Sequence, residues 1–360
     1  MKFGAVAIEH SLGGIVAHRL KFGPLVLDKG EIVTAGHVAA LRGLGVEEIV
    51  VARMEPGEVG EDAAALAVAG ALAGDHLAIR APMTGRVNLH AQRDGIFLAD
   101  RGLIDRLNDV DEAITLATVA PMAVVLEGEM VATVKIIPFA VAQSSLAAAL
   151  AVAREGRIST APYQPQRIGV VSTLLPGLKS SAIDKTLMVL ADRIAASGSV
   201  IAAEERVAHE APALARNIAR LSRSCDLVIV FGASAITDRR DVIPAAIEAC
   251  GGHIVQFGMP VDPGNLLLLA RLGDATPVLG APGCARSCKE NGFDWVLHRL
   301  LARVPVTSRD IRRMGAGGLI SAPARPHKSE ARERRISAGR HQTGRPLDAA
   351  AAPAPNEMGF

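Results

Sequence analysis

The stretch DLVIVFGASAITDRRDVIPAAIEA, residues 226–249, decides the fold that we predict. It begins with Leu227–Phe231, a short apolar and largely β-branched run between an acid and a glycine. Such a run is typical of a strand that is buried on both faces of a parallel sheet. A loop of small residues, 232–235, the polar run 238–241 and a segment with helical spacing follow. Because open α/β sheets bind ligands where a strand leads into a helix, this loop is the first candidate site.

The same alternation of strands and helices extends over residues 168–302. Alternating elements of this length predict a three-layer α/β domain, in which a parallel sheet is covered by helices on both faces. We expect strands at Ile168–Ser172, Val200–Ile201, Leu227–Phe231, Ile254–Phe257 and Thr276–Leu279, and helices at Asp184–Ala196, Ala211–Ser222, Leu266–Leu272 and Ser287–Ala302.

The chain before this domain has a different pattern, in which short apolar pieces are broken by glycines and alanine-rich helical segments. We predict a smaller mixed α+β region there. The segment between the two regions contains Pro162 and Pro165 and has the composition of a linker. The predicted organisation is an N-terminal region at 1–158, a linker at 159–167, the sheet domain at 168–305, a C-terminal extension at 306–321, and a disordered basic tail at 322–360 that is rich in Pro, Arg, Ala and Ser.

Length and composition exclude a membrane protein. The 360 residues suffice for about two domains. Although 49% of the residues are hydrophobic, the longest apolar stretch, 136–153, is interrupted by Pro138 and by the polar residues 143–145. A membrane span needs about 20 mostly apolar residues, and the N-terminus MKFGAVAIEHS does not have the pattern of a signal peptide. We therefore expect a soluble, cytoplasmic protein that does not enter a membrane.

The charges argue against nucleic acid as a partner. The net charge is +2, and the segment from Ala322 onward has seven Lys or Arg against four Asp or Glu, a net of +3 that leaves about −1 for the rest. The main body therefore offers no general basic field for nucleic acid. The four cysteines do not form a disulfide framework. Cys284 and Cys288 lack the second ligand pair of a zinc site, so we predict no metal site.

Four loops follow predicted strands of the sheet domain, at residues 173–184, 231–241, 258–265 and 280–287. In a parallel sheet these loops gather at the carboxyl edge. Their glycines and the helix N-termini favour an anion, and an aspartate can accept two parallel hydrogen bonds from the guanidine-like edge of a pterin. This content predicts a phosphorylated heterocycle as the ligand. The predicted binding residues are Asp184, Gly232, Ser234, Asp241, Pro263, Gly264, Gly280, Gly283 and Ser287.

Several of these residues have an alternative, purely structural interpretation. Ser287 and Glu290 fit the S-x-x-E pattern of a helix capping box, which needs no ligand. Asp184 and Asp241 could equally be N-caps of the helices that follow them. The sequence leaves both interpretations open.

The motifs of the sheet domain point to a known family. Residues 168–302 resemble the molybdopterin-binding domain shared by molybdopterin adenylyltransferases and molybdopterin molybdotransferases. The run 238–244, DRRDVIP, is similar to the R-D-V-T-P motif of the adenylyltransferases and aligns the motif aspartate with Asp241. Pro263–Gly264 and the run 280–283, GAPG, are similar to the K-P-G-K-P and G-L-P-G-N-P loops of the molybdotransferases. The first region resembles the molybdotransferases more loosely, through GEDAA at 60–64, TLAT at 115–118 and VKIIP at 134–138.

The resemblance implies a protein of molybdenum cofactor biosynthesis that binds molybdopterin. Asp241 would hold the pterin and Asp184 would line the pocket, while backbone amides near 232–234 and 280–287 would hold the phosphate. The implied molybdotransferase reaction inserts molybdate into adenylated molybdopterin and releases AMP with the assistance of Mg²⁺. However, the acidic G-D-E positions of that family fall within 173–176, TLLP, in this chain, and the lysine of its P-G-K loop is Asn265. Because magnesium prefers carboxylate oxygens, binding should survive these changes more easily than catalysis.

Two further functions remain open at this point. The chain would be a binding module that presents molybdopterin to a cofactor nucleotidyltransferase, or a phosphohydrolase that acts on nucleotide cofactors with the same domain. Proteins of this type often dimerise, so we also expect a homodimer.

Overall fold

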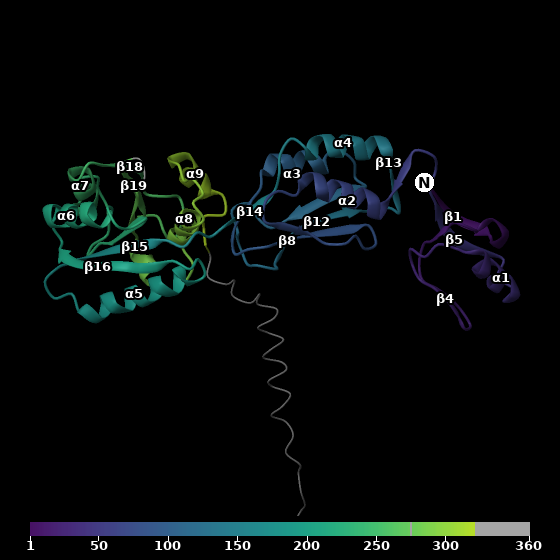
Figure 1. Cartoon of the computed structure of the whole chain (residues 1–360), viewed down its shortest axis with the longest axis horizontal. Coiled ribbons are helices and arrows are strands. Elements are labelled where there is room, and N and C mark those ends of the chain that lie inside the picture. Colours follow the sequence, from purple (N-terminus) through teal and green to yellow (C-terminus); the bar gives the residue numbers. More distant parts are fainter. Residues whose placement is uncertain (274–275, 321–360) are drawn as a thin grey trace, which may run out of the picture.

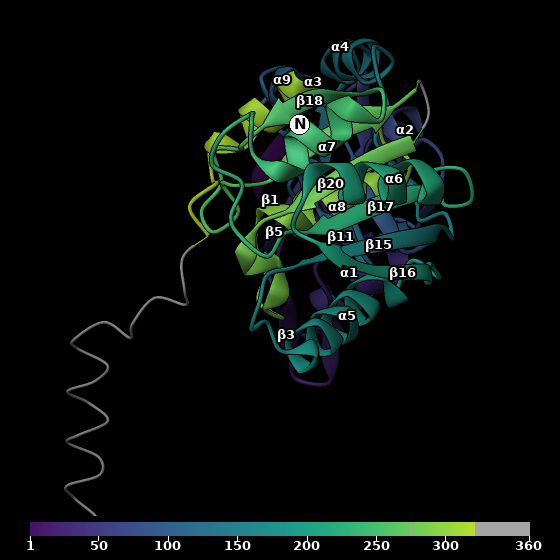
Figure 2. The same cartoon turned by 90° about the vertical axis from the view of Figure 1, so that its left-hand side faces the viewer.

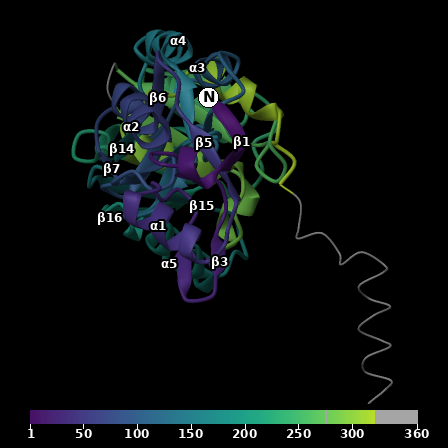
Figure 3. The same ribbon diagram turned by 90° about the vertical axis from the view of Figure 1, so that its right-hand side faces the viewer.

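The structure is a computed structural model of the chain, and it describes residues 1–273 and 276–320. Figure 1 shows three successive units along the long axis: an N-terminal unit (residues 1–53), a middle unit (58–162) and a sheet unit (167–320). The first two units each enclose a separate hydrophobic cluster, and the sheet unit encloses two, one on each face of its sheet. In Figure 3 the N-terminal unit lies in front of the other two. The predicted N-terminal region 1–158 thus spans two hydrophobic cores.

The N-terminal unit is a small antiparallel sheet with one helix against it. The strand order is β1-β5-β2, and a two-stranded hairpin, β3-β4, extends from it. Val16, Leu27, Leu41 and Val51 are buried in its core. The bounds are β1 Lys2–Ala7, β2 Ile15–Val16, β3 Leu20–Phe22, β4 Leu25–Leu27, α1 Ala35–Gly43 and β5 Glu48–Arg53, with a 3-10 turn η1 at Ile8–His10.

The middle unit packs helices α2, α3 and α4 on antiparallel sheets (Figure 1). Its strand orders are β10-β12-β8-β7, β11-β9-β14 and β13-β6. Small residues on α2, among them Ala65 and Ala69, allow the helix to lie close to β8 and β12. The bounds are β6 Glu58–Gly60, α2 Glu61–Leu72, β7 Leu77–Ile79, β8 Arg86–Ala91, β9 Gly95–Leu98, α3 Arg101–Asn108, β10 Ile114–Thr118, β11 Val124–Val125, β12 Met130–Ile136, β13 Ala140–Ala142, α4 Gln143–Ala153 and β14 Ser159–Pro162.

The sheet unit contains one six-stranded sheet of order β16-β15-β17-β20-β19-β18. Strands β16, β15, β17 and β20 are mutually parallel, whereas β19 runs antiparallel to both of its neighbours. The bounds are β15 Arg167–Leu174, α5 Ser180–Ala195, β16 Val200–Ala208, α6 Ala211–Leu221, β17 Leu227–Phe231, α7 Val242–Ala249, β18 Gly252–Phe257, β19 Leu268–Leu272, β20 Thr276–Ala281, η2 Gly283–Arg286, α8 Gly292–Leu301, α9 Ser308–Arg312 and η3 Arg313–Gly315.

Side chains alternate between the two faces of this sheet. On β17, Ile229 and Phe231 pack in a cluster with residues of α5 and α8, while Val228 and Val230 pack in a cluster with residues of α6 and α7. Figure 2 shows α5 on one side of the strands and α6 and α7 on the other. The predicted three-layer α/β fold with a smaller mixed α+β part before it is therefore confirmed.

Some predicted elements of the sheet unit differ from the structure. Leu266–Leu272 was expected to be a short helix, but Leu268–Leu272 forms β19. A short continuous apolar run has no period that separates a buried helix from a buried strand, and Leu268, Leu269 and Ala270 are completely buried between sheet neighbours. The last helix was expected from Ser287, but α8 begins at Gly292 with Asn291 as its cap.

The segment expected to be a linker is bonded to both of its neighbours. Ser159–Pro162 pairs with β9 as strand β14. Gln164 and Gln166 then donate hydrogen bonds to the carbonyl groups of Leu301 and Leu300, at 2.9 and 2.8 Å. These bonds join the middle unit to the end of α8 and set the position of one unit against the other.

The C-terminal extension packs on the sheet unit as far as residue 320. Ile311 of α9 and Met314 of η3 are buried against the α8 side of the core. The predicted disordered tail, 322–360, lies outside the described residues. In the part of the chain that the structure describes, no helix combines the length and the apolar character that crossing a membrane requires.

Candidate functional site

Four polar side chains meet at the carboxyl ends of adjacent strands. Thr173 is near the end of β15, His209 follows β16, Ser234 lies three residues after β17, and Arg286 ends the turn η2 after β20. Because β16, β15, β17 and β20 are neighbours and parallel, these positions share one edge of the sheet. We call these four residues the carboxyl-edge cluster.

A chain of hydrogen bonds runs through three members of the cluster. The hydroxyl of Thr173, which is only 1% exposed, accepts from the Ala233 N–H at 2.8 Å and lies 2.8 Å from Nδ1 of His209. Since a buried hydroxyl needs an acceptor for its own proton, the arrangement assigns Nδ1 as that acceptor. The neutral imidazole then has its proton on Nε2, which lies 3.4 Å from Oγ of Ser234. The imidazole is therefore oriented by Thr173 and presents an N–H toward Ser234.

The fourth member, Arg286, places a positive charge at the same edge. Its guanidinium donates to the carbonyl of Gly232 at 2.7 Å and to Oγ1 of Thr186 at 3.3 Å, and lies 5.5 Å from the ring centre of Phe231. Burial lowers the pKa of Arg286, because desolvation disfavours its charged form. In the described ranges, no carboxylate forms an ion pair with Arg286. An anionic ligand at this edge would supply the missing countercharge.

The loop that bears Arg286 is held by a buried ion pair. Nε of Arg193 on α5 donates to Asp294 on α8 at 2.6 Å, and both side chains are about 10% exposed or less. The same guanidinium donates to the carbonyl of Ala285 at 2.7 Å and to that of Ser287. Arg193 thus connects α5, the loop and α8, and the position of Arg286 follows from this connection.

Gly232 and Ser234, two of the predicted binding residues, lie at the cluster. A Cβ on Gly232 would come within 2.7 Å of the Ser234 carbonyl oxygen, so the tight turn between β17 and Ser234 requires glycine. Ser234 is exposed and lies beside His209.

The two predicted aspartates already have partners. Asp241 is the N-cap of α7: one carboxylate oxygen accepts from the Val242 N–H at 2.9 Å and the other from the Thr237 N–H at 3.2 Å. Asp184 lies in the second turn of α5, where it pairs with Arg206 of β16 at 2.6 Å. Lys179, not Asp184, occupies the N-cap position of α5.

The other predicted residues lie in the loops after β18 and β20. The carbonyl of Pro263 accepts from the Gly292 N–H at 2.9 Å, and Gly264, at φ 140°, has no room for a Cβ against Gly292. These two residues therefore support the start of α8. Gly280 is part of β20, where a Cβ would contact Ile236 at 2.8 Å, while Gly283 faces open space.

Ser287 does not form the expected capping box. Its hydroxyl accepts from the Lys289 N–H at 3.2 Å, and its carbonyl accepts from Arg193. The capping box is formed instead by Asn291 and Asp294, at the true start of α8.

Sequence reasoning missed Thr173, His209 and Arg286 as binding residues. β16 extends over nine residues to Ala208, whereas the sequence indicated a strand only at Val200–Ile201. The polar residues 204–206 lie on an edge strand, where one face is solvated, so the apolar pattern that marks a buried strand is lost. Extending the strand to its end would have identified His209 as a carboxyl-edge residue.

The donor set does not form a magnesium site of its own. In residues 1–273 and 276–320, no group of three or more His, Cys, Asp or Glu side chains could hold a metal ion. Asp184 and Asp241, the two aspartates predicted here, are engaged with Arg206 and with backbone N–H groups.

Glu61 of the middle unit does not supplement this edge within one chain. Glu61 lies with Arg86 and Lys135 around a separate cavity of about 400 Å³. Glu61 directly follows β6, which pairs with β13, and Figure 1 places β13 at the end of the middle unit beside the N-terminal unit. The sheet unit lies beyond the opposite end.

Comparison with known proteins places the sheet unit in a family. Residues 168–303 match the family described as "Probable molybdopterin binding domain". The fold and this match define an α/β domain of the molybdopterin-binding family, as the resemblance implied. None of the curated proteins matches the chain.

The solved structures that are similar to the chain include the following three. One is a molybdopterin biosynthesis MoeA protein from Pyrococcus horikosii, with 15% identity, coverage of 86% of this chain and 76% of that one, and a TM-score of 0.30. Another is a molybdenum cofactor biosynthesis protein from Pyrococcus furiosus, with 10% identity, coverage of 84% and 64%, and a TM-score of 0.25. The third is the molybdopterin biosynthesis enzyme MoaB from Thermus thermophilus, with 17% identity, coverage of 39% and 98%, and a TM-score of 0.28. The fold assignment rests on the strand order and packing described above.

Proposed function

We propose that the chain binds molybdopterin at the carboxyl edge of the sheet unit and acts in molybdenum cofactor biosynthesis. The observation that supports this most directly is the carboxyl-edge cluster, which gathers an arginine without a carboxylate partner in the described residues, an imidazole and two hydroxyls. All four residues lie within the stretch that matches the molybdopterin-binding family.

The cluster suits the phosphate of the ligand. Hydrogen bonds to a charged group are stronger than neutral ones, and Arg286 provides a guanidinium whose nearest partners are neutral oxygens. Nε2 of His209 and the exposed hydroxyl of Ser234 add donors at the same edge. The loop 280–287 is fixed by Arg193, so Arg286 is ordered before a ligand arrives.

Asp241 remains the residue that we propose for the pterin ring. Each of its carboxylate oxygens accepts one backbone N–H, and a carboxylate oxygen has a second lone pair for a further donor. The N–H groups along a pterin edge could therefore bond to Asp241 without displacing the cap of α7. In this arrangement the hydrogen bonds from the N–H groups of Thr237 and Val242 orient the carboxylate of Asp241.

For activity, we propose insertion of molybdate into adenylated molybdopterin. In this reaction the residues of this chain bind and orient the substrate: Arg286 neutralises phosphate charge, and the Nε2–H of His209 donates a hydrogen bond to the phosphate. Magnesium would supply charge neutralisation on the phosphates in the full reaction. We assign no step to it, because Asp184 and Asp241 are already engaged.

A non-catalytic carrier of molybdopterin is the second candidate. It is favoured by Leu174 and Leu175, which stand at the end of β15 where the molybdotransferases have acidic residues. Leu175 is 45% exposed and offers no ligand for a cation. In this version the chain presents the cofactor to a nucleotidyltransferase. A homodimer also remains a prediction.

The first experiment measures binding and turnover with the full chain. Molybdopterin and adenylated molybdopterin are titrated separately into the protein, and saturable binding of at least one is expected. Failure of both to bind would overturn the proposal. Release of AMP that depends on molybdate and Mg²⁺ would identify the enzyme, whereas binding without release would identify the carrier. Hydrolysis of simple nucleotide cofactors would instead support the phosphohydrolase.

Variants test whether the cluster is the binding site. We expect His209→Ala and Ser234→Ala to weaken molybdopterin binding by about tenfold or more, since a hydrogen bond to a charged group contributes about 1.5–3 kcal/mol. His253→Ala is the matched control, because His253 is an exposed histidine on β18. If His209→Ala bound as tightly as His253→Ala, the cluster would not be the phosphate site.

A further inference from the structure

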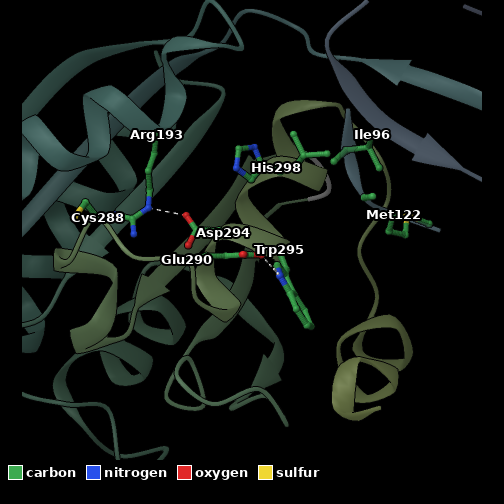
Figure 4. Close-up of a pocket in the computed structure, with 10 residues that line it drawn as sticks. Ile96, Met122, Arg193, Cys288, Glu290, Asp294, Trp295 and His298 are labelled. Atoms are coloured by element: carbon green, nitrogen blue, oxygen red, sulfur yellow. Dashed lines mark hydrogen bonds and ion pairs between the residues drawn. The ribbon is translucent and has the colours of Figure 1, made fainter. Parts of the chain in front are cut away.

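A cleft separates the middle unit from α8 and the C-terminal extension. It consists of two adjoining cavities of about 490 and 720 Å³ that share Met122, Ala123 and Trp295. Each volume is in the range of small-molecule sites, about 300–1,000 Å³. Figure 4 shows Trp295 and His298 on α8, with Ile96 and Met122 of the middle unit nearby. None of the residues of the carboxyl-edge cluster lines either cavity.

The wall between the two cavities is aromatic and apolar. Trp295 is the only tryptophan in the chain, and its Nε1 donates to Glu290 at 2.9 Å, which fixes the orientation of the indole. Met122 and Ile96 come from the middle unit. A flat ring fits such a wall, because aromatic faces and methionine side chains both make favourable contacts with it.

The second cavity is strongly basic. Arg101, Arg299 and Arg313 line it, with Asp310 as the one carboxylate among its lining residues. Asp310 caps α9 by accepting from the Thr307 N–H at 2.8 Å. Within the described part of the chain, neither Arg299 nor Arg313 forms an ion pair, and Nε of Arg299 is buried without an acceptor. A buried N–H without an acceptor is costly, and the three arginines outnumber the one carboxylate among the lining residues, so this cavity favours an anion.

The cleft is held in place by the segment between the two units. Strand β14 pairs with β9, which contributes Ile96, and the hydroxyl of Tyr163 lies 2.8 Å from Nδ1 of His298. Gln164 and Gln166 bond to the carbonyls at the end of α8. Both walls are therefore connected by hydrogen bonds through residues 159–166, and a ligand need not bring them together.

We propose that this cleft binds a nucleoside phosphate. The base lies against Trp295 and Met122, and the phosphate lies on Arg299 and Arg313. A purely apolar ligand would leave the buried Nε of Arg299 without an acceptor, and inorganic phosphate would leave the aromatic wall uncovered. The proposal concerns a site separate from the carboxyl-edge cluster and does not depend on the proposed function.

The single tryptophan provides the measurement. AMP and ATP are titrated into the full chain while the fluorescence of Trp295 is followed, and saturable quenching is expected. Adenosine and inorganic phosphate should each bind at least about tenfold more weakly than AMP, because adenosine lacks the contacts to the arginines and phosphate lacks those to the aromatic wall. No saturation by AMP or ATP in the millimolar range would overturn the proposal. Phosphate that binds as tightly as AMP would overturn the assignment of a nucleoside.

Two arginine variants test the phosphate contact. Arg313→Ala removes an exposed side chain and should leave the fold intact, and we expect it to weaken AMP binding by about tenfold. Arg299→Met keeps the aliphatic volume and should weaken binding at least as much. Arg309→Ala is the control, since Arg309, on the adjacent helix α9, is likewise exposed but does not line the cavity. Equal affinity in Arg313→Ala and Arg309→Ala would refute the site.

A cross-comparison keeps the two sites distinguishable. His209→Ala should leave the AMP-dependent quenching of Trp295 unchanged, and Arg313→Ala should leave molybdopterin binding unchanged. If His209→Ala abolished the quenching while Arg313→Ala did not, AMP would be binding at the carboxyl edge and the cleft proposal would be wrong.

Discussion

The imidazole of His209 and the hydroxyl of Thr173 lie 2.8 Å apart at the ends of β16 and β15, although 36 positions separate them in sequence. This contact connects two loops of the sheet unit, because Thr173 also accepts the N–H of Ala233. One buried hydroxyl thus orients the imidazole and anchors the turn after β17. The carboxyl-edge cluster depends on this pair.

Replacing Thr173 tests the contribution of that hydroxyl. In Thr173→Val the shape is retained, but the Ala233 N–H loses its acceptor and His209 loses its donor. We expect a loss of about 1–3 kcal/mol in the free energy of unfolding, measured by urea denaturation. Thr173→Ser should retain most of the stability. Equal stability of the valine and wild-type proteins would show that the hydrogen bond is not significant.

Replacing Asp241 separates a cap from a ligand contact. Asp241→Ala should lower the free energy of unfolding by about 1 kcal/mol, because the start of α7 loses its acceptor. Asp241→Asn caps nearly as well, so its stability should stay within about 0.5 kcal/mol of wild type, while molybdopterin binding weakens. Asp238→Asn, in the exposed loop beside it, is the control. Unchanged affinity in Asp241→Asn would leave Asp241 as a helix cap alone.

Breaking the Arg193–Asp294 pair should be costly. Arg193→Met leaves the carboxylate of Asp294 buried and without its cation, and removing one partner of a buried pair costs about 3–5 kcal/mol. The carbonyls of Ala285 and Ser287 lose their donors as well. We expect a large drop in denaturation midpoint. A loss below about 1 kcal/mol, the size expected of surface pairs, would contradict the buried pair.

The stability of the chain should depend on pH through His298. Burial lowers the pKa of His298 below its ordinary value of 6.5. The unfolded state therefore binds a proton more readily than the folded state, and stability falls as the pH falls below about 6.5 toward the lower folded value.

The matching measurement compares melting temperatures between pH 7.5 and 5. His298→Gln can retain a hydrogen bond to Tyr163 but does not titrate, so it should lose less stability over this window than wild type. His253→Gln, at an exposed position, should follow the wild-type curve. Parallel curves for wild type and His298→Gln would exclude a contribution from His298.

The local sequence pattern predicted the secondary structure of the sheet unit correctly where an element is buried along its whole length. Leu227–Phe231 was predicted as a strand buried on both faces, and β17 is buried along its entire length. The prediction failed where the position of a strand in the sheet, and not its hydrophobic pattern, determines the structure. The leucines of β19 have no helical or strand period, and the polar residues of β16 mark a solvated edge.

By itself, the sequence determined the alternation of strands and helices, the loops that lead from strands into helices, and the motifs of the molybdopterin-binding family. These depend on hydrophobic period and local turn chemistry, which act over a few residues. Only the tertiary structure decided that His209 meets Thr173, that Arg193 holds the loop of Arg286, and that Asp184 pairs with Arg206. It also decided that Trp295 and three arginines line a cleft between two units. Such contacts join residues distant in sequence, and they depend on how the strands are ordered and the units connected, which local periodicity does not encode.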